Sequence, residues 1–231
     1  MTCYFWYIVT LPHLYYYLTT DDFHNHTGEK KWPKPLHSFG ELELLPFVKQ
    51  LCLRNMTGFT LGPPGGSTFR YFSALKNLQE LGIDSLNISR LMPDIQRYFG
   101  HFAETLRFLA LKEPRGSRRQ ILYFIGHFPN LRDLKISCTR YIKEEEDHPT
   151  LIPPDIPPLG GRLTLACFER EELVKDMVTL FDGLRFRYMD LFNVNCVGTL
   201  LEACADTLET LRLYPTDLYG EDLSETNTGA S

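Results

Sequence analysis

Four polar side chains near the N-terminus come closest in this sequence to a metal-binding set. Asp21, Asp22, His24 and His26 lie within one short segment, and carboxylate and imidazole groups are common ligands of divalent metals. No recognisable motif adds a further His, Cys or carboxylate ligand to them. We therefore predict no metal site and no cofactor. A metal-dependent activity at this cluster is kept as the third functional hypothesis, after the two functions described below.

The usual catalytic patterns are missing from the sequence. It contains no G-x-S-x-G nucleophile elbow, no H-E-x-x-H zinc motif and no recognisable Cys/His arrangement. The glycine-rich segment 62–67, GPPGGS, lacks the Gly-Lys-Ser/Thr ending of a phosphate-binding loop. We predict no catalytic residue and a protein that is not an enzyme.

The six cysteines point to a compartment rather than to a reaction. They are far apart, none forms a C-x-x-C pair, and most lie inside apolar runs, where cysteine behaves as a small hydrophobic residue. Such usage favours a reducing environment, and we expect the cytoplasm or the nucleus.

Charge and hydropathy limit the classes of partner. The net charge is −5 and the pI about 5.8, whereas nucleic-acid-binding proteins usually carry a basic excess, so we expect no nucleic-acid partner. The arginines Arg115, Arg118 and Arg119 are interpreted as a solvated face. The first 20 residues are uncharged but contain Pro12, His13 and several threonines, so we predict an edge strand or a poorly folded leader rather than a membrane helix.

One apolar pattern recurs along the chain and determines the predicted architecture. The motif apolar-x-x-apolar-x-apolar occurs six times and once more in a weaker form, with steps of 22 to 30 residues between the copies. The copies are VKQLCL from Val48, LQELGI from Leu78, LRFLAL from Leu106, LRDLKI from Leu131, GGRLTL from Gly160, FRYMDL from Phe186 and LETLRL from Leu208. In each copy the last two apolar positions, two residues apart, point to the same face of a strand and enter a shared core.

Segments with helical periodicity separate these strands. We predict helices that begin at the caps Ser89 and Ser117, a third over 171–181 and a fourth near 197–204. His101 and His127 fall at equivalent helix ends, where a histidine interacts favourably with the helix dipole. The fold predicted is α/β: an irregular leucine-rich-repeat solenoid with parallel strands on its concave face and helices outside.

The domain boundaries follow from the pattern. Residues 1–35 form a strand-rich leader or cap, 36–215 the solenoid of about seven repeats, and 216–231 a polar tail. Residues 143–161 combine an acidic run with five prolines, so we expect them to loop out between two strands.

The repeat region resembles that of fungal F-box/leucine-rich-repeat proteins over about residues 36–220. The resemblance lies in the run from LKNLQELGI to FPNLRDLKI, and in GGRLTLACFEREELVKDMVTLFDGLRFRYMDLFNV followed by LLEACADTLETLRLYPTD. It implies a substrate receptor of a cullin–RING ubiquitin ligase, whose partner is a ubiquitination substrate. The family's N-terminal helical F-box is not recognisable in the first 35 residues, and regular repeats carry an Asn where this chain has Leu86, Val194 and Thr216. We therefore expect the chain to bind a ligase adaptor only if an F-box lies upstream, and keep a stand-alone scaffold as the alternative.

The strand register also predicts a protein-binding face. Residues that alternate with the core pair point outward onto the concave side, and aromatic side chains gather toward the C-terminal strands. The predicted binding residues are Phe108, Lys112, Lys135, Tyr188, Asp190, Phe192, Arg212 and Tyr214. The alternative for Phe192 and Tyr214 is that both fold over the strand ends and extend the core.

Overall fold

The computed structural model describes most of the region that carries the apolar pattern. Its described residues are 17–20, 45–54, 72–91, 95–137, 142–143, 158–168, 171–181 and 183–214. The Asp21–His26 cluster, the segment 62–67, most of the proline-rich interruption and the tail from residue 215 lie outside these residues.

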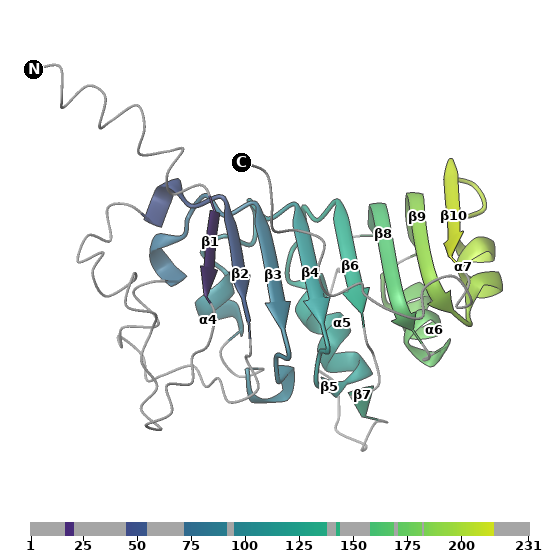
Figure 1. Cartoon of the computed structure of the whole chain (residues 1–231), viewed down its shortest axis with the longest axis horizontal. Coiled ribbons are helices and arrows are strands. Elements are labelled where there is room, and N and C mark those ends of the chain that lie inside the picture. Colours follow the sequence, from purple (N-terminus) through teal and green to yellow (C-terminus); the bar gives the residue numbers. More distant parts are fainter. Residues whose placement is uncertain are drawn as a thin grey trace, which may run out of the picture.

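The described residues form an α/β structure whose main sheet has eight strands, paired in chain order and all parallel (Figure 1). The strands are β1 Tyr17–Thr20, β2 Gln50–Leu53, β3 Glu80–Asp84, β4 Phe108–Lys112, β6 Asp133–Ser137, β8 Leu159–Phe168, β9 Leu184–Val194 and β10 Thr210–Tyr214. For Tyr17–Thr20 the expected edge strand is confirmed, since β1 pairs only with β2 among the described strands. Two short strands that the sequence did not suggest, β5 Gly116–Ser117 and β7 Ile142–Lys143, pair in a separate small sheet.

The register of the sheet agrees with the apolar pattern. Leu51, Leu81, Leu109, Leu134, Leu163, Met189 and Leu211 lie opposite one another across seven strands. The second apolar position is aligned in the same way, from Leu53 through Ile83 and Leu111 to Leu213. The sheet therefore presents two continuous rows of large apolar side chains to one face.

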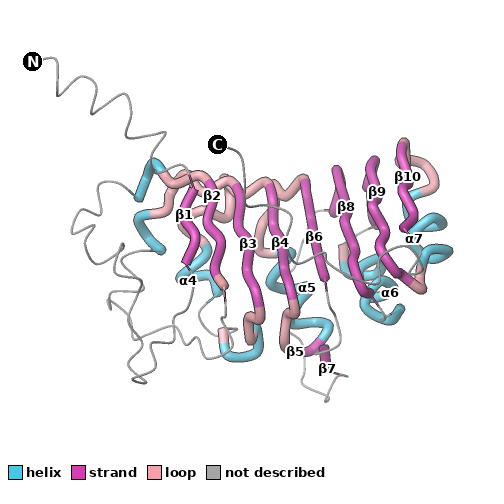
Figure 2. Tube along the Cα trace, in the orientation of Figure 1, coloured by secondary structure: helices cyan, strands magenta, loops and turns pink. Residues whose placement is uncertain are grey.

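Four α-helices whose bounds lie within the described residues pack against that face and close the core (Figure 2). They are α4 Ile95–Phe99, α5 Arg118–Gly126, α6 Glu171–Leu180 and α7 Val197–Cys204, and a short 3-10 helix, η1 Leu45–Phe47, precedes β2. Their inward residues join the strand leucines in one buried cluster, in which Phe72, Phe99, Phe102, Phe124 and Phe128 form a chain of ring contacts.

The last strand departs from the predicted core. Leu213 occupies the same register position as the buried Leu191, yet 53% of it is exposed, and Leu211 is only partly buried. The expectation that both apolar positions of the last copy are buried is therefore wrong for Leu213. Burial of a strand side chain needs neighbours on both sides, and no described strand follows β10.

Local sequence signals predicted three of the four helices well. Ser117 caps α5 in a capping box, in which its hydroxyl accepts from the Gln120 backbone N–H while the Gln120 side chain accepts from the Ser117 N–H. The cap predicted at Ser89 is wrong. Ser89 lies instead within a further 3-10 helix, η3 Ile88–Arg90. Its hydroxyl donates to Gln120 Oε1 at 2.6 Å, because the β-bridge between Asn87 and Arg115 holds η3 beside the segment that leads into α5.

A recurring polar position that we did not predict from the sequence links successive copies of the apolar motif through hydrogen bonds. An Asn or Thr directly before the first leucine of four copies donates to a carbonyl oxygen of the preceding turn. The bonds run from Asn77 to Pro46 (3.0 Å), Thr105 to Leu78 (2.8 Å), Asn130 to Glu104 (3.0 Å) and Thr207 to Phe186 (3.2 Å). The recurring dipeptide Asn/Thr-Leu was a visible signal for these bonds.

Candidate binding face

The face of the sheet opposite the buried leucines carries all eight predicted binding residues. Their strand positions alternate with the core positions, and none of them belongs to the buried core cluster. They form two groups rather than one continuous site. Phe108, Lys112 and Lys135 lie on β4 and β6, whereas the remaining five lie on β9 and β10, and β8 separates the groups.

The C-terminal group, which we call the β9–β10 cluster, consists of Tyr188, Asp190, Phe192, Arg212 and Tyr214. Phe192 and Tyr214 pair in register and their rings stack in parallel, with centroids 4.2 Å apart and planes 3° apart. Arg212 lies 3.9 Å from the Asp190 carboxylate and keeps 62% of its side chain exposed. Phe192 and Tyr214 therefore stack on each other on the outer face, rather than extending the core.

Arg162 is a member of this surface that the sequence reading missed. Its guanidinium lies over the Tyr188 ring, 5.7 Å from the centroid, and Tyr188 itself is 40% exposed. The two residues pair across β8 and β9. The signal was available, because Arg162 occupies the third position of the weak copy GGRLTL, the position that Tyr188 occupies in the next copy.

The N-terminal group lines a groove of about 460 Å³, which we call the β2–β6 groove. Small residues form its middle, since Cys52, Gly82 and Ala110 occupy the same register position on three neighbouring strands. Phe108, Lys112 and Lys135 of the predicted face line it as well, together with Arg54, Asp84 and Ser137. The volume falls in the range of sites that hold small molecules or short peptide segments.

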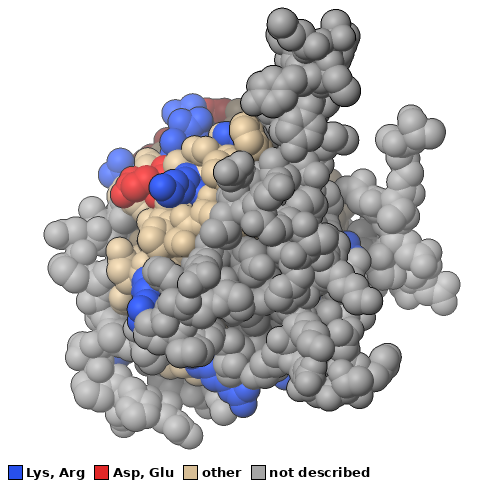
Figure 3. Space-filling view, turned by 90° about the vertical axis from the view of Figure 1, so that its left-hand side faces the viewer, with Lys and Arg blue, Asp and Glu red and all other residues tan. Residues whose placement is uncertain are grey.

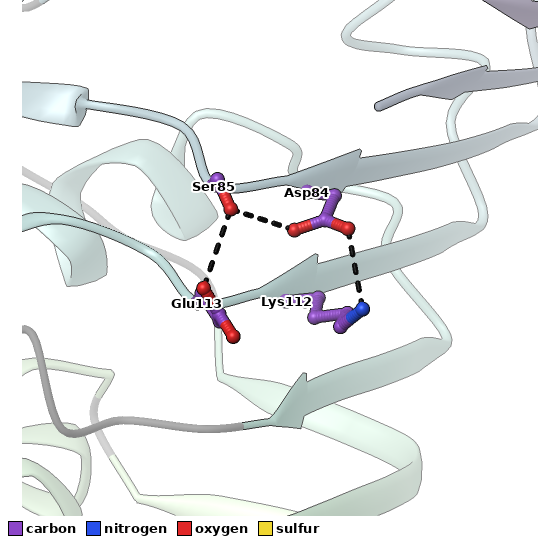
Figure 4. A network of polar contacts seen from close by, with 4 residues as sticks. All are labelled: Asp84, Ser85, Lys112 and Glu113. Carbon is purple, nitrogen blue, oxygen red and sulfur yellow. Dashed lines mark hydrogen bonds and ion pairs between the residues drawn. The ribbon is translucent and has the colours of Figure 1, made fainter. Parts of the chain in front are cut away.

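A polar network borders this groove where β3 and β4 end (Figure 4). Lys112 Nζ lies 3.3 Å from Asp84 Oδ2, and the Ser85 hydroxyl lies 2.8 Å from Asp84 Oδ1 and 3.4 Å from Glu113 Oε2. Ser85 is the one buried polar residue among those described. Because a hydroxyl has a single proton, it donates to one carboxylate at a time, and Asp84 offers the shorter contact.

Two features of the described residues bear on their chemistry, namely the spacing of their metal-ligating side chains and the shifted pKa values of their buried thiols and imidazole. Among them no three His, Cys, Asp or Glu residues lie close enough to hold a metal ion. Burial raises the pKa of the Cys196 thiol to about 11 and also raises that of Cys204, which keeps both sulfurs protonated and poorly nucleophilic. Burial likewise lowers the pKa of His127 below its usual value.

Two ion pairs on the helical side differ in what they join: Lys175 and Glu171 pair within α6 and are exposed, whereas the second pair links two helices. Arg118 joins α5 to α6 through Asp176 Oδ2 at 2.8 Å, so this arginine is not simply solvated as the sequence suggested. At the end of the molecule nearest β1, Lys and Arg side chains are scattered between uncharged and acidic ones wherever residues are described (Figure 3).

No described helix is both long and apolar enough to cross a bilayer. In comparisons with known proteins, no protein-family model matches the chain, and neither a curated protein nor a solved structure shows significant similarity to it.

Proposed function

We propose that this chain is a non-enzymatic protein-binding module whose binding surface is the sheet face opposite the helices. The observation that carries the proposal is that, among the residues that the structure describes, helices cover only one face of the sheet. Parallel sheets normally have both faces buried under helices, yet α4, α5, α6 and α7 all join the core on one face. The other face keeps Tyr188 and Arg212 exposed.

The residue types on that face support a protein partner. Tyrosine and arginine are enriched among the residues that dominate protein interfaces, because they bring a large contact area and directed hydrogen bonds at a modest entropy cost. The β9–β10 cluster offers two tyrosines, a phenylalanine and an arginine on adjacent strands. Its aromatic groups are already ordered by the Phe192–Tyr214 stack, which reduces the entropy lost on binding.

As part of the same proposal, the chain is an irregular leucine-rich-repeat solenoid. Parallel strands in chain order, a recurring register and recurring turn bonds support this assignment. By its resemblance to F-box/leucine-rich-repeat proteins, the module would be the substrate-recognition part of a cullin–RING ligase receptor. The alternative is a stand-alone scaffold. The two differ in adaptor binding, and we expect this chain by itself not to bind a ligase adaptor; micromolar association of the two purified proteins would contradict that.

The test of the binding face is a pair of double variants. We expect Tyr188→Ala with Arg212→Ala to abolish partner capture from a lysate of the native cells while leaving the melting temperature unchanged, because both side chains are exposed. The matched control is Glu172→Ala with Lys175→Ala on the exposed side of α6, which should capture the same proteins as the wild type. A large drop in melting temperature, or unchanged capture by the first variant, would contradict the proposal.

A further inference from the structure

We infer that the β2–β6 groove binds an acidic peptide segment, laid across the strands in an extended conformation. The inference rests on the proposed function, in that it names the chemistry of a partner for one part of the same face. It concerns a site separate from the β9–β10 cluster, because β8 lies between the two.

The charge of the groove is opposite to that of the chain. Three basic residues, Arg54, Lys112 and Lys135, line the groove against one acidic residue, Asp84, whereas the whole chain carries a net charge of −5. Lys135 is exposed. A carboxylate placed beside it gains a charge-assisted hydrogen bond, which a neutral amide does not provide.

Lys112 is available to a ligand although it already has a partner. Its contact with Asp84 is 3.3 Å long, and 59% of the Lys112 side chain is exposed. Ion pairs with this much solvent exposure contribute about 0–1 kcal/mol, so an incoming carboxylate competes for the ammonium group at little cost. Asp84 retains the Ser85 hydroxyl as a donor when Lys112 turns away.

The shape of the groove favours an extended chain over a compact ligand. Cys52, Gly82 and Ala110 leave a shallow floor that crosses β2, β3 and β4, and Lys135 on β6 stands at its end. Four strands span roughly 14 Å at the usual spacing of about 4.8 Å, which corresponds to about four or five extended residues. Phe108 beside the floor provides an apolar surface for a side chain between the carboxylates.

The peptide would be recognised through its side chains rather than by addition as a further strand. Each of β2, β3, β4 and β6 has a paired strand on both sides, so their backbone groups are already used within the sheet. Strand addition requires an open edge. Specificity therefore depends on Lys112, Lys135 and the free space above Gly82 and Ala110.

The test uses the full chain and two pools of fluorescein-labelled six-residue peptides, measured by fluorescence anisotropy. One pool has Glu at alternate positions with mixed apolar residues between, and the other has Gln in place of each Glu. We expect the Glu pool to bind about tenfold more tightly than the Gln pool, as for the loss of one charge-assisted bond. Lys135→Glu should remove this preference, whereas Lys175→Glu, the same charge change on exposed α6, should keep it.

A second variant tests shape without changing charge. Ala110→Leu fills the floor and should weaken binding of the Glu pool by at least about tenfold. If Ala110→Leu does not fold, Gly82→Leu replaces it, because a Cβ at Gly82 meets its nearest atom, Cys52 Sγ, at an ordinary 3.5 Å. The inference would be overturned if both pools bind equally, if neither binds, or if Lys135→Glu keeps the preference for the Glu pool. It would also be overturned if a single-stranded RNA oligonucleotide displaces the labelled Glu pool at a lower concentration than the unlabelled Glu pool does.

The two proposals fail in different ways. If partner capture depends on Tyr188 and Arg212 while the peptide pools show no charge preference, the groove inference is wrong and the binding module stands. If capture survives the Tyr188 and Arg212 substitutions and neither pool binds, both proposals are wrong.

Discussion

Ser85 and Glu113 occupy the same position at the ends of two neighbouring strands, and both adopt a left-handed backbone conformation. Their φ angles are 60° and 50°, and the Ser85 hydroxyl lies 3.4 Å from Glu113 Oε2. Asn193 (φ 52°) follows Phe192, which is in register with Lys112, so the same conformation recurs at a third strand. The backbone N–H of Ser85 donates to Lys112 and that of Glu113 to Ser137, so the ladder continues through the bend. The left-handed residue directly follows the last residue of β3 and of β4, whereas Asn193 lies within β9, which remains paired with β8 as far as Val194.

The left-handed backbone predicts an unusual order of stability at position 113. A residue with a Cβ pays about 1–2 kcal/mol in this conformation, whereas glycine does not. We therefore expect Glu113→Gly to be more stable than Glu113→Ala by about 1 kcal/mol, although both lose the same carboxylate. Lys112→Gly and Lys112→Ala are the controls, because Lys112 lies in the regular strand β4. At this position we expect the alanine variant to be the more stable of the two. Urea unfolding of the four variants checks this order, and an alanine advantage at both positions would contradict it.

The aligned strand leucines should contribute to one core. Leu109 and Leu134 are buried, and we expect Leu109→Ala or Leu134→Ala to lower the free energy of unfolding by about 2–5 kcal/mol. Leu213→Ala is the matched control, because it removes the same atoms from a register position that is 53% exposed, and it should cost less than about 1 kcal/mol. Thermal and urea unfolding measure all three. Similar costs at Leu213 and Leu109 would mean that the last strand is covered in solution.

The burial of His127 predicts a loss of stability in mild acid. Burial lowers the pKa of His127 in the folded state below its usual value near 6.5, so the unfolded chain binds the additional proton. The neutral His127 therefore contributes its full share of the folding stability above pH 6.5, and this contribution is lost as the pH falls from there through the lowered pKa of the folded state. We expect the free energy of unfolding of the wild type to fall between about pH 7.5 and 5.5, and His127→Gln to remove part of that fall. His101→Gln, at the exposed equivalent position, controls for the loss of an imidazole, and an equal effect of both substitutions would argue against the role of burial.

The cysteines should differ widely in reactivity. With a pKa of about 11, roughly one Cys196 thiol in a thousand is ionised at about pH 8, and Cys204, at the other end of α7, is buried in the same core. Cys52 lines the β2–β6 groove and is only partly buried. Iodoacetamide labelling read by peptide mass spectrometry should modify Cys52 well before Cys196 or Cys204 in the folded protein. Adding urea should equalise the rates, and early labelling of Cys196 would show that α7 opens readily.

Short-range patterns were enough to predict seven strands of the main sheet, three of the helices and the strand register, although not β5, β7 or the start of α4. The copies from Val48 to Leu208 alternate apolar and polar residues with a period of two, and a strand shifted by one residue would turn Leu109 and Leu111 toward solvent. The capping box at Ser117 is equally local, because donor and acceptor lie three residues apart in the sequence. The outward positions, including Tyr188 and Arg212, follow from the same alternation.

The tertiary structure decided which of those outward residues meet and how deeply each is buried. Arg162 lies over Tyr188, and Cys52, Gly82 and Ala110 form one floor, only because particular strands became neighbours. Leu213 is exposed and Leu191 is buried although the sequence treats them alike, because burial depends on what packs on each side of a strand. The left-handed conformation of Ser85 and Glu113 could not be predicted from the sequence either, since neither residue type favours it. The backbone hydrogen bonds that continue the strand ladder hold both residues in this conformation.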